Sequence, residues 1–172
     1  TLGAVDAKAV TTITGSAVDV KTVLAATTID TAADVAVTVS DTTVSVADAN
    51  IIAAATTGKV TATIAAGAAA DLDALVDGVQ QVNAYTLTVN GATAAALDLI
   101  ALNGKTTGKI TVDAKEITGI AADVTTVLTD TTSDFIGEEK AAVKVTVAAA
   151  ANLVDAILAK TTGVVTATVQ SG

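Results

Sequence analysis

Four carboxylates in the stretch 130–139 are the side chains of this sequence best suited to chemistry: Asp130, Asp134, Glu138 and Glu139. The stretch has no hydrophobic periodicity and contains Gly137, which is typical of a loop. Hard oxygen ligands on a loop suit Ca²⁺, so these four residues are the candidate metal ligands. Their spacing does not match the EF-hand loop. The alternative is that they begin a helix and solvate a loop.

Enzyme chemistry has little support in the composition. The chain contains no His and no Cys, and all nine of its cationic residues are Lys. General acid–base catalysis near neutral pH most often uses His. A Ser or Thr nucleophile would need a partner such as Lys140 or Lys144, but these residues beside Glu138 and Glu139 are better explained as a solvated charge run. We therefore predict a protein that is not an enzyme, with no catalytic residues and no cofactor apart from the Ca²⁺ candidate.

The charge and hydrophobic composition restrict the kinds of partner that this chain can bind. The net charge is −9 and Arg is absent, so no basic patch is available for nucleic acid. Hydrophobic residues make up 51% of the chain, but Thr, Asp or Lys interrupts them every few positions. A spanning helix needs about 20 consecutive apolar residues. We therefore expect neither a nucleic-acid partner nor a membrane span.

Threonines at alternate positions suggest a second kind of binding chemistry. On strands they would stack into ladders that offer hydroxyls to an ordered surface such as ice or crystalline polysaccharide; the pairs are Thr61/Thr63, Thr86/Thr88 and Thr166/Thr168. Asp113 and Lys144 interrupt the pattern, and Thr is also the ordinary polar choice for the wet side of a strand. A binding module for glycan, Ca²⁺ or an ordered surface is therefore the alternative function.

The segments that must position these side chains repeat along the chain. Thr-Thr-Gly stands at 56–58, 106–108 and 161–163, and Thr1-Leu2-Gly3 opens the first copy. The steps 1 to 56, 56 to 106 and 106 to 161 are 55, 50 and 55 residues. Such a period is typical of stacked architectures, in which each unit covers the hydrophobic face of the next. We therefore predict a single repeat array that spans residues 1–172. It consists of copies 1–55, 56–105 and 106–160 and a terminal strand 161–172.

Each copy is predicted to fold as strand, helix, strand, helix. Apolar–polar alternation predicts strands at 60–64, 110–114, 165–169, 35–39, 85–89 and 143–147. Helical stripes predict helices around 20–24, 51–52, 71–76, 99–100, 120–128 and 157–158. Because glycine often ends a helix in the left-handed conformation, we expect that role for Gly58, Gly108 and Gly163.

These elements predict an α/β fold, a right-handed solenoid of strand–helix repeats. Strands that follow helices in one sheet pair in parallel through right-handed crossovers. Their polar alternate positions place helices on one face of a leucine-rich-repeat-like sheet and solvent on the other. With aromatic residues at 1%, the core must be Ala, Val, Ile and Leu. A compact open α/β domain and a β-solenoid with helical corners remain alternatives.

Two phrases carry a family resemblance: Val5-Asp-Ala-Lys-Ala-Val-Thr-Thr-Ile-Thr-Gly15 and Val112-Asp-Ala-Lys-Glu-Ile-Thr-Gly119. They resemble units of very long, repetitive, adhesin-like surface proteins of marine cyanobacteria and other aquatic bacteria. The resemblance implies an extracellular or cell-surface location and brings no catalytic residues. The Gly-Gly-x-Gly-x-Asp nonapeptide that often holds calcium in such proteins is absent.

The sequence therefore favours a non-catalytic structural repeat module of a larger secreted or cell-surface protein, which acts as a spacer, assembly or adhesion segment. The chain begins and stops without polar capping repeats, so its expected partners are neighbouring repeats of the same parent chain. Glycan or other cell-surface material is a further possible partner.

Overall fold

The computed structural model describes residues 3–77, 83–130 and 135–170. The protein is α/β, and every strand pair is parallel. The chain forms two compact units. The first unit takes Thr1–Ala65, Ala74–Thr86 and Lys105–Gly108, and the second takes Ala66–Asp73, Leu87–Gly104 and Lys109–Gly172.

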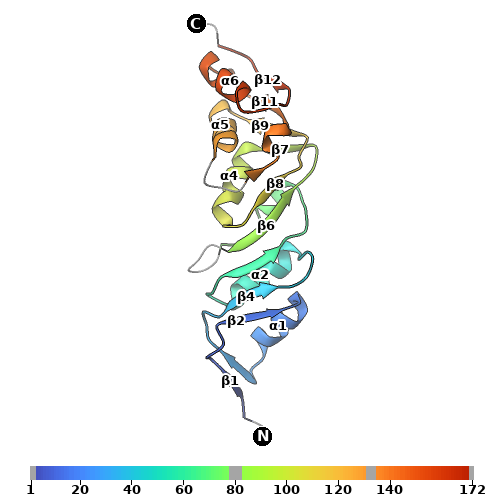
Figure 1. Ribbon diagram of the computed structural model, residues 1–172, viewed down its shortest axis with the longest axis vertical. Helices are drawn as coiled ribbons and strands as arrows, with labels where there is room; N and C mark the ends of the chain where they lie inside the picture. Colours follow the sequence, from blue (N-terminus) through green and yellow to red (C-terminus); the bar gives the residue numbers. More distant parts are fainter. Residues whose placement is uncertain (1–2, 78–82, 131–134, 171–172) are drawn as a thin grey trace. The chain divides into compact units, whose positions relative to one another are not determined.

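The first unit alternates strands with two helices (Figure 1). Its elements are β1 (Val5–Ala7), β2 (Thr12–Gly15), α1 (Ala17–Ala25), β3 (Ile29–Thr31), β4 (Ala36–Val39), α2 (Val46–Ala55), β5 (Val60–Thr63) and the first three residues of β6 (Ala84–Val89). Strand β1 pairs with β3, and β2, β4, β5 and β6 pair in that order. Each strand therefore pairs with the corresponding strand one strand–helix turn later in the chain.

The second unit continues the same alternation. Its elements are α3 (Ala69–Leu72), the rest of β6, β7 (Thr93–Ala95), most of α4 (Ala96–Lys105), β8 (Ile110–Val112), β9 (Glu116–Gly119), α5 (Ala121–Thr129), β10 (Phe135–Ile136), the 3₁₀ turn η1 (Glu138–Lys140), β11 (Ala142–Val145), α6 (Ala151–Leu158) and β12 (Val165–Thr166). Strands β6, β8 and β10 pair in that order, and so do β7, β9, β11 and β12.

Most of the predicted helices and strands are confirmed, although α3 ends at Leu72 and β12 covers only Val165–Thr166. The single sheet is wrong. The strands form separate sheets because the extended segment of a strand–helix turn is interrupted, so that it contributes two short strands in place of one. Between β1 and β2, the Lys8 N–H donates to Asp6 Oδ1 at 3.1 Å and the Val10 N–H donates to the Ala7 carbonyl at 3.0 Å. These local bonds take the place of ladder bonds and end β1.

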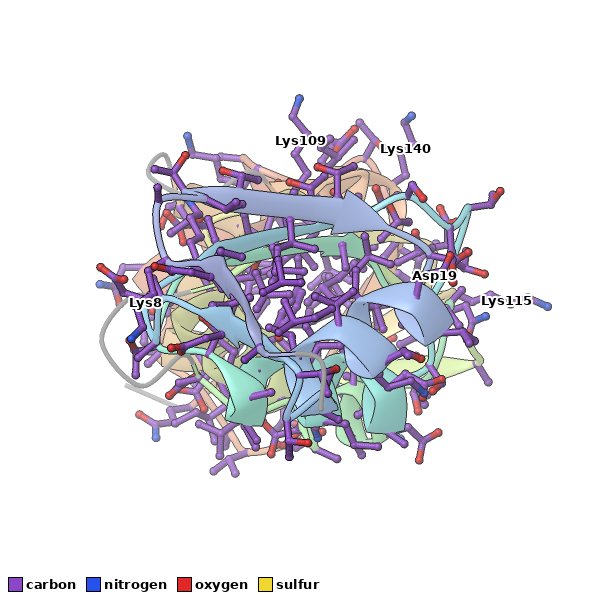
Figure 2. The ribbon with its side chains drawn as sticks, turned by 90° about the horizontal axis from the view of Figure 1, so that it is seen from below. Lys8, Asp19, Lys109, Lys115 and Lys140 are labelled. Carbon is purple, nitrogen blue, oxygen red and sulfur yellow. The ribbon has the colours of Figure 1, made fainter. Side chains whose placement is uncertain are left out.

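Each unit has its own aliphatic core. Strand β5 buries Val60 and Ala62 and exposes Thr61 and Thr63, which confirms the predicted alternation. The most deeply buried side chains of the first unit include Val20, Ile52, Ile64, Leu75 and Tyr85, and those of the second include Leu72, Leu87, Leu99, Leu102, Ile110, Ile117 and Ile157. Burial of such a side chain contributes about 1.5–3 kcal/mol. Figure 2 shows the labelled lysine side chains extending outward.

The predicted left-handed helix stops at Gly58, Gly108 and Gly163 are wrong. Among the described residues, the glycines with positive φ are Gly91 (116°) and Gly137 (91°). The Thr-Thr-Gly glycines are needed because neighbouring backbone approaches them closely. A Cβ at Gly108 would overlap the Tyr85 carbonyl, and a Cβ at Gly163 would overlap the Ala141 carbonyl.

Candidate functional site

The Thr-Thr-Gly motif makes the most regular polar contacts of the protein. Thr106 Oγ1 donates to the Tyr85 carbonyl at 2.7 Å and accepts from the Tyr85 N–H at 2.8 Å and the Gly108 N–H at 2.9 Å. The Thr107 N–H donates to the Asn83 carbonyl at 2.8 Å. We call a Thr-Thr-Gly triplet, together with the two carbonyls it reaches in the preceding turn, a clasp.

The same clasp recurs in both units. In the first unit, Thr56 Oγ1 donates to the Val35 carbonyl at 2.6 Å, and the Thr57 N–H donates to the Ala33 carbonyl at 2.8 Å. In the second unit, Thr161 Oγ1 lies 3.2 Å from the Ala141 carbonyl, and the Thr162 N–H donates to the Glu139 carbonyl at 2.8 Å. A threonine hydroxyl thus joins strand backbone 20 or 21 residues earlier. Sequence reasoning missed this role, although the triple recurrence of the motif was its signal.

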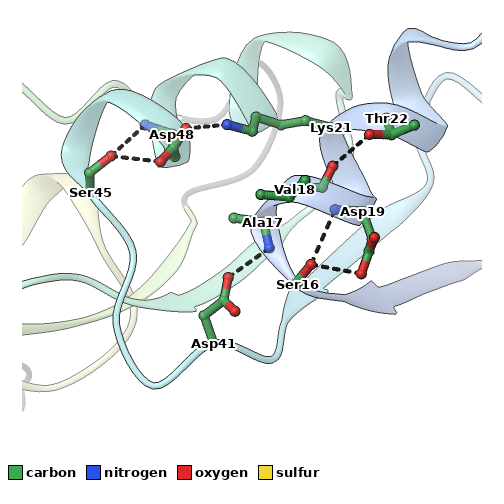
Figure 3. Close-up of polar contacts among 9 residues, drawn as sticks. All are labelled: Ser16, Ala17, Val18, Asp19, Lys21, Thr22, Asp41, Ser45 and Asp48. Atoms are coloured by element: carbon green, nitrogen blue, oxygen red, sulfur yellow. Dashed lines mark hydrogen bonds and ion pairs between the residues drawn. The ribbon is translucent and has the colours of Figure 1, made fainter.

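The helices of the first unit are tied down by a second polar network (Figure 3). Ser16 caps α1, since its Oγ accepts from the Asp19 N–H at 3.2 Å and donates to Asp19 Oδ2 at 2.7 Å. Asp41, from the loop after β4, accepts from the Ala17 N–H at 2.7 Å. This contact satisfies a second free N–H at the positive end of α1. Ser16 and Asp41 thus fix the start of α1.

Helix α2 begins in the same way and is joined to α1 by an ion pair. Ser45 Oγ accepts from the Asp48 N–H at 3.0 Å and donates to Asp48 Oδ2 at 2.9 Å. The Lys21 ammonium of α1 pairs with Asp48 Oδ1. The hydrogen bond from Lys21 lowers the pKa of Asp48, and the bond from Ser45 lowers it further. The charges of Lys21 and Asp48 therefore serve to cap α2 and to join it to α1.

The first unit also contains a buried pair of polar side chains. Asn83 and Tyr85 are fully buried, and Asn83 Nδ2 donates to the Tyr85 hydroxyl at 3.0 Å. Asn83 Oδ1 accepts from the Val60 N–H at 2.9 Å. Burial raises the pKa of Tyr85 to about 12. A neutral phenol that accepts one hydrogen bond inside the core has a structural role, because it offers no ionised group for chemistry.

The acidic segment proposed for Ca²⁺ is described in part. Asp134 lies outside the described residues, whereas Asp130, Glu138 and Glu139 lie within them. Asp130 Oδ2 accepts from Asn103 Nδ2 at 3.0 Å. Burial raises the pKa of Glu138, and the charges of Glu139 and Asp130 raise it further. Glu138 Oε2 is buried and has no hydrogen-bond partner within the described part of the chain.

Those carboxylates do not form a ready metal cage. Over residues 3–77, 83–130 and 135–170, no group of three or more His, Cys, Asp or Glu side chains is placed to hold a metal ion. Because Asp134 is outside these ranges, the four-residue calcium site stays a prediction.

The strand threonines that face away from the core have different surroundings in the two units. In the first unit, parallel register aligns Thr14 with Thr38 and Thr38 with Thr61, and Thr63 lies beside Thr86. We call these five residues and Thr12 the threonine face. In the second unit, Lys144 of β11 stands between Thr118 of β9 and Thr166 of β12. Glu116 likewise pairs with Thr93.

Lysines of the second unit border one hollow without converging on it. The hollow, about 340 Å³, is lined by β8, by the turn around Gly137 and by Asp113, Lys115 and Lys140. Figure 2 shows the Lys115 and Lys140 side chains extending away from the ribbon in different directions. This arrangement does not place two ammonium groups on one anion.

Comparison of the chain with protein-family models, curated proteins and solved structures finds no match. The resemblance to long bacterial surface proteins therefore stays a prediction. In the described part of the chain, no helix has both the length and the apolar character required to cross a membrane.

Proposed function

We propose that this chain is a non-catalytic structural repeat module of a larger secreted or cell-surface protein. In this proposal its strand–helix turns stack as a right-handed solenoid and act as a spacer, assembly or adhesion segment. Neighbouring repeats of the same parent chain are the expected partners.

The clasp is the observation that carries the proposal. Its hydroxyl reaches back by one strand–helix turn and satisfies backbone groups of the preceding turn. A polar device that fixes the same spacing three times supports a repetitive scaffold, because an isolated turn would leave those groups unpaired. The parallel pairing of each strand with its counterpart one turn later gives the same support.

The side chains outside the clasps also fit a scaffold. The polar side chains of α1 and α2 form caps, one ion pair and bonds to backbone groups, and the buried phenol of Tyr85 is held neutral. Such fixed contacts leave few groups free to react.

Small-angle X-ray scattering of the full chain tests the solenoid. A compact globule of 172 residues has a radius of gyration of about 16 Å, whereas stacked turns should give a clearly larger value and a rod-like cross-section. A radius near that of the globule would count against the solenoid. Antibodies against the module should label intact cells of the source organism, and labelling only after lysis would contradict a surface location.

A second candidate function, calcium binding by the acidic segment, is favoured by one observation. Burial raises the pKa of Glu138 most, and the charges of Glu139 and Asp130 raise it further, so these carboxylates are close enough to repel one another. A divalent cation would relieve that repulsion. Titration calorimetry with Ca²⁺ should give heat in the unaltered chain and none in Glu138→Gln. Equal heat in both proteins, or none in either, would remove this candidate.

A further inference from the structure

The threonine face differs from the clasp and helix threonines in how its hydroxyls are used. The hydroxyls of the clasp and helix threonines donate hydrogen bonds to backbone carbonyls, as those of Thr106 and Thr125 do. In the described part of the chain, no hydrogen bond of the protein engages the hydroxyls of the face: Thr12, Thr14, Thr38, Thr61, Thr63 and Thr86. Each hydroxyl on the face therefore remains available as both donor and acceptor.

Parallel pairing sets these hydroxyls on a regular grid. Thr14, Thr38 and Thr61 stand side by side on three neighbouring strands, which lie about 4.8 Å apart in a sheet. Thr61 and Thr63 are two residues apart on β5, which corresponds to about 6.7 Å along the strand. Because threonine is branched at Cβ, its χ1 is restricted, so the hydroxyls lose little freedom when they meet a partner.

The chemistry of the face restricts that partner. The face carries no charged residue; the nearest along a strand is Lys59, two residues before Thr61. Ala36 and Ala84 fill the register positions beside Thr12 and Thr61. Alternation places Lys59 on the same side as Thr61, so an anionic ligand would meet one ammonium group at the margin of the face and none within it.

A sugar chain would find no ring to stack on. Tyr85 is fully buried, and Phe135 belongs to the second unit. Threonine offers a methyl group and a hydroxyl at each grid point. That combination suits a repeating lattice of water molecules, which needs hydrogen-bond donors and acceptors at fixed intervals and no strongly hydrated charge.

We propose that the threonine face of the first unit binds the surface of ice through an ordered layer of water. The second unit supplies an internal comparison, because Lys144 stands between Thr118 and Thr166 on the corresponding strands. An ammonium group keeps its own hydration shell and would lose it against an ice lattice. The ice-binding activity should therefore reside in the first unit alone. This inference stands independently of the structural role proposed above.

Ice-recrystallisation inhibition by the full chain tests the proposal. The unaltered protein should keep ice grains small during annealing, and Thr61→Lys should abolish that effect, because it places an ammonium group in the middle of the grid. Thr118→Lys makes the same chemical change on the second unit and should leave the inhibition intact. Thermal unfolding of both variants checks that they fold.

Thr61→Val separates the hydroxyl from the side-chain shape. If hydroxyls carry the contact, this variant should fold normally and lose most of the inhibition, whereas Thr61→Ser should retain part of it. Grain growth equal to buffer in the unaltered protein would overturn the proposal. So would equal losses in Thr61→Lys and Thr118→Lys, or retention of the protein on crystalline cellulose or chitin in the absence of ice activity.

Discussion

The hydroxyls of Ser16 and Ser45 cap α1 and α2 of the first unit. The N-cap residues of α5 and α6 in the second unit are Ile120 and Ala150, which make no side-chain cap bond. The strands differ as well. The first unit exposes uncharged threonines, and the second places Glu116 and Lys144 at the matching register positions. Both units nevertheless keep the same parallel pairing and the same clasp.

The comparison of the two units shows which features the repeated strand–helix fold requires and which can vary. Helix caps and outward-facing strand residues vary between the units, so neither is essential to the strand–helix fold. The clasp and its glycine do not vary, because the backbone of the preceding turn fills the space where a side chain would lie. The predictions that follow test this distinction between fixed and variable positions.

The largest effect is expected at a clasp glycine. Gly108→Val should destabilise the protein by about 3 kcal/mol or more, because its Cβ would overlap the Tyr85 carbonyl and the strand backbone cannot move aside. Gly104, four residues earlier in α4, has open space around its Cβ position. Gly104→Ala should therefore be neutral or stabilise by about 0.5–1 kcal/mol.

Chemical denaturation measures both glycine variants. Hydrogen exchange should place the damage of Gly108→Val in the first unit and that of Gly163→Val in the second. Similar stabilities for Gly108→Val and Gly104→Ala would mean that close backbone approach does not explain why each clasp has a glycine.

The next effect concerns Tyr85, which belongs to the first unit. Its pKa is raised to about 12, so at pH 10–12 the unfolded chain loses the phenol proton and the folded chain keeps it. Stability should fall as pH rises through this window and change no further on that account above it. Since the chain has one Tyr and no Trp, phenolate absorbance reports this residue alone. An absorbance midpoint near 10 in the folded protein would contradict the buried phenol.

A smaller loss is expected when a clasp loses its hydroxyl and keeps its shape. Thr106→Val leaves the Tyr85 and Gly108 N–H groups without their acceptor, which should cost about 1–3 kcal/mol. Thr63→Val on the threonine face removes a hydroxyl that no protein group uses and should change stability by less than about 0.5 kcal/mol. Equilibrium unfolding in urea compares the two; equal losses would erase the distinction between clasp and face.

The smallest effect tests the helix caps in both directions. Ser45→Ala should cost about 1 kcal/mol, because the Asp48 N–H loses its acceptor. Ala150→Ser should gain about 0.5–1 kcal/mol by giving α6 the cap that α2 already has. Calorimetric melting of the two variants measures the changes, and a loss at both positions would show that the uncapped helix start is already satisfied in another way.

Local patterns in the sequence predict most of the secondary structure, because alternation and helical stripes report burial directly. The outward threonines of β5 follow from the same short-range rules. The role of the clasp glycine could not be predicted in this way. A Gly after a helix usually has positive φ, whereas Gly108 is required by a carbonyl 23 residues away in the chain, and contacts at that distance leave no local pattern.

The candidate sites likewise depend on contacts between residues that are distant in the sequence. Parallel register, which single-strand patterns do not fix, decides that Thr14, Thr38 and Thr61 form one row and that Lys144 interrupts another. The bend at Lys8, which splits the extended segment into β1 and β2, depends on one Asp side chain competing with the ladder.

The clasp has a consequence for how such a gene lengthens. Each stretch of 50 or 55 residues between successive Thr-Thr-Gly triplets contains one donor triplet and one pair of receiving carbonyls. An in-frame duplication between triplets therefore delivers a copy already equipped to fasten on both sides, without any compensating mutation. We expect a chain with residues 56–105 duplicated to fold on first expression, whereas an insertion between Tyr85 and Thr106 should separate that triplet from the carbonyl it reaches.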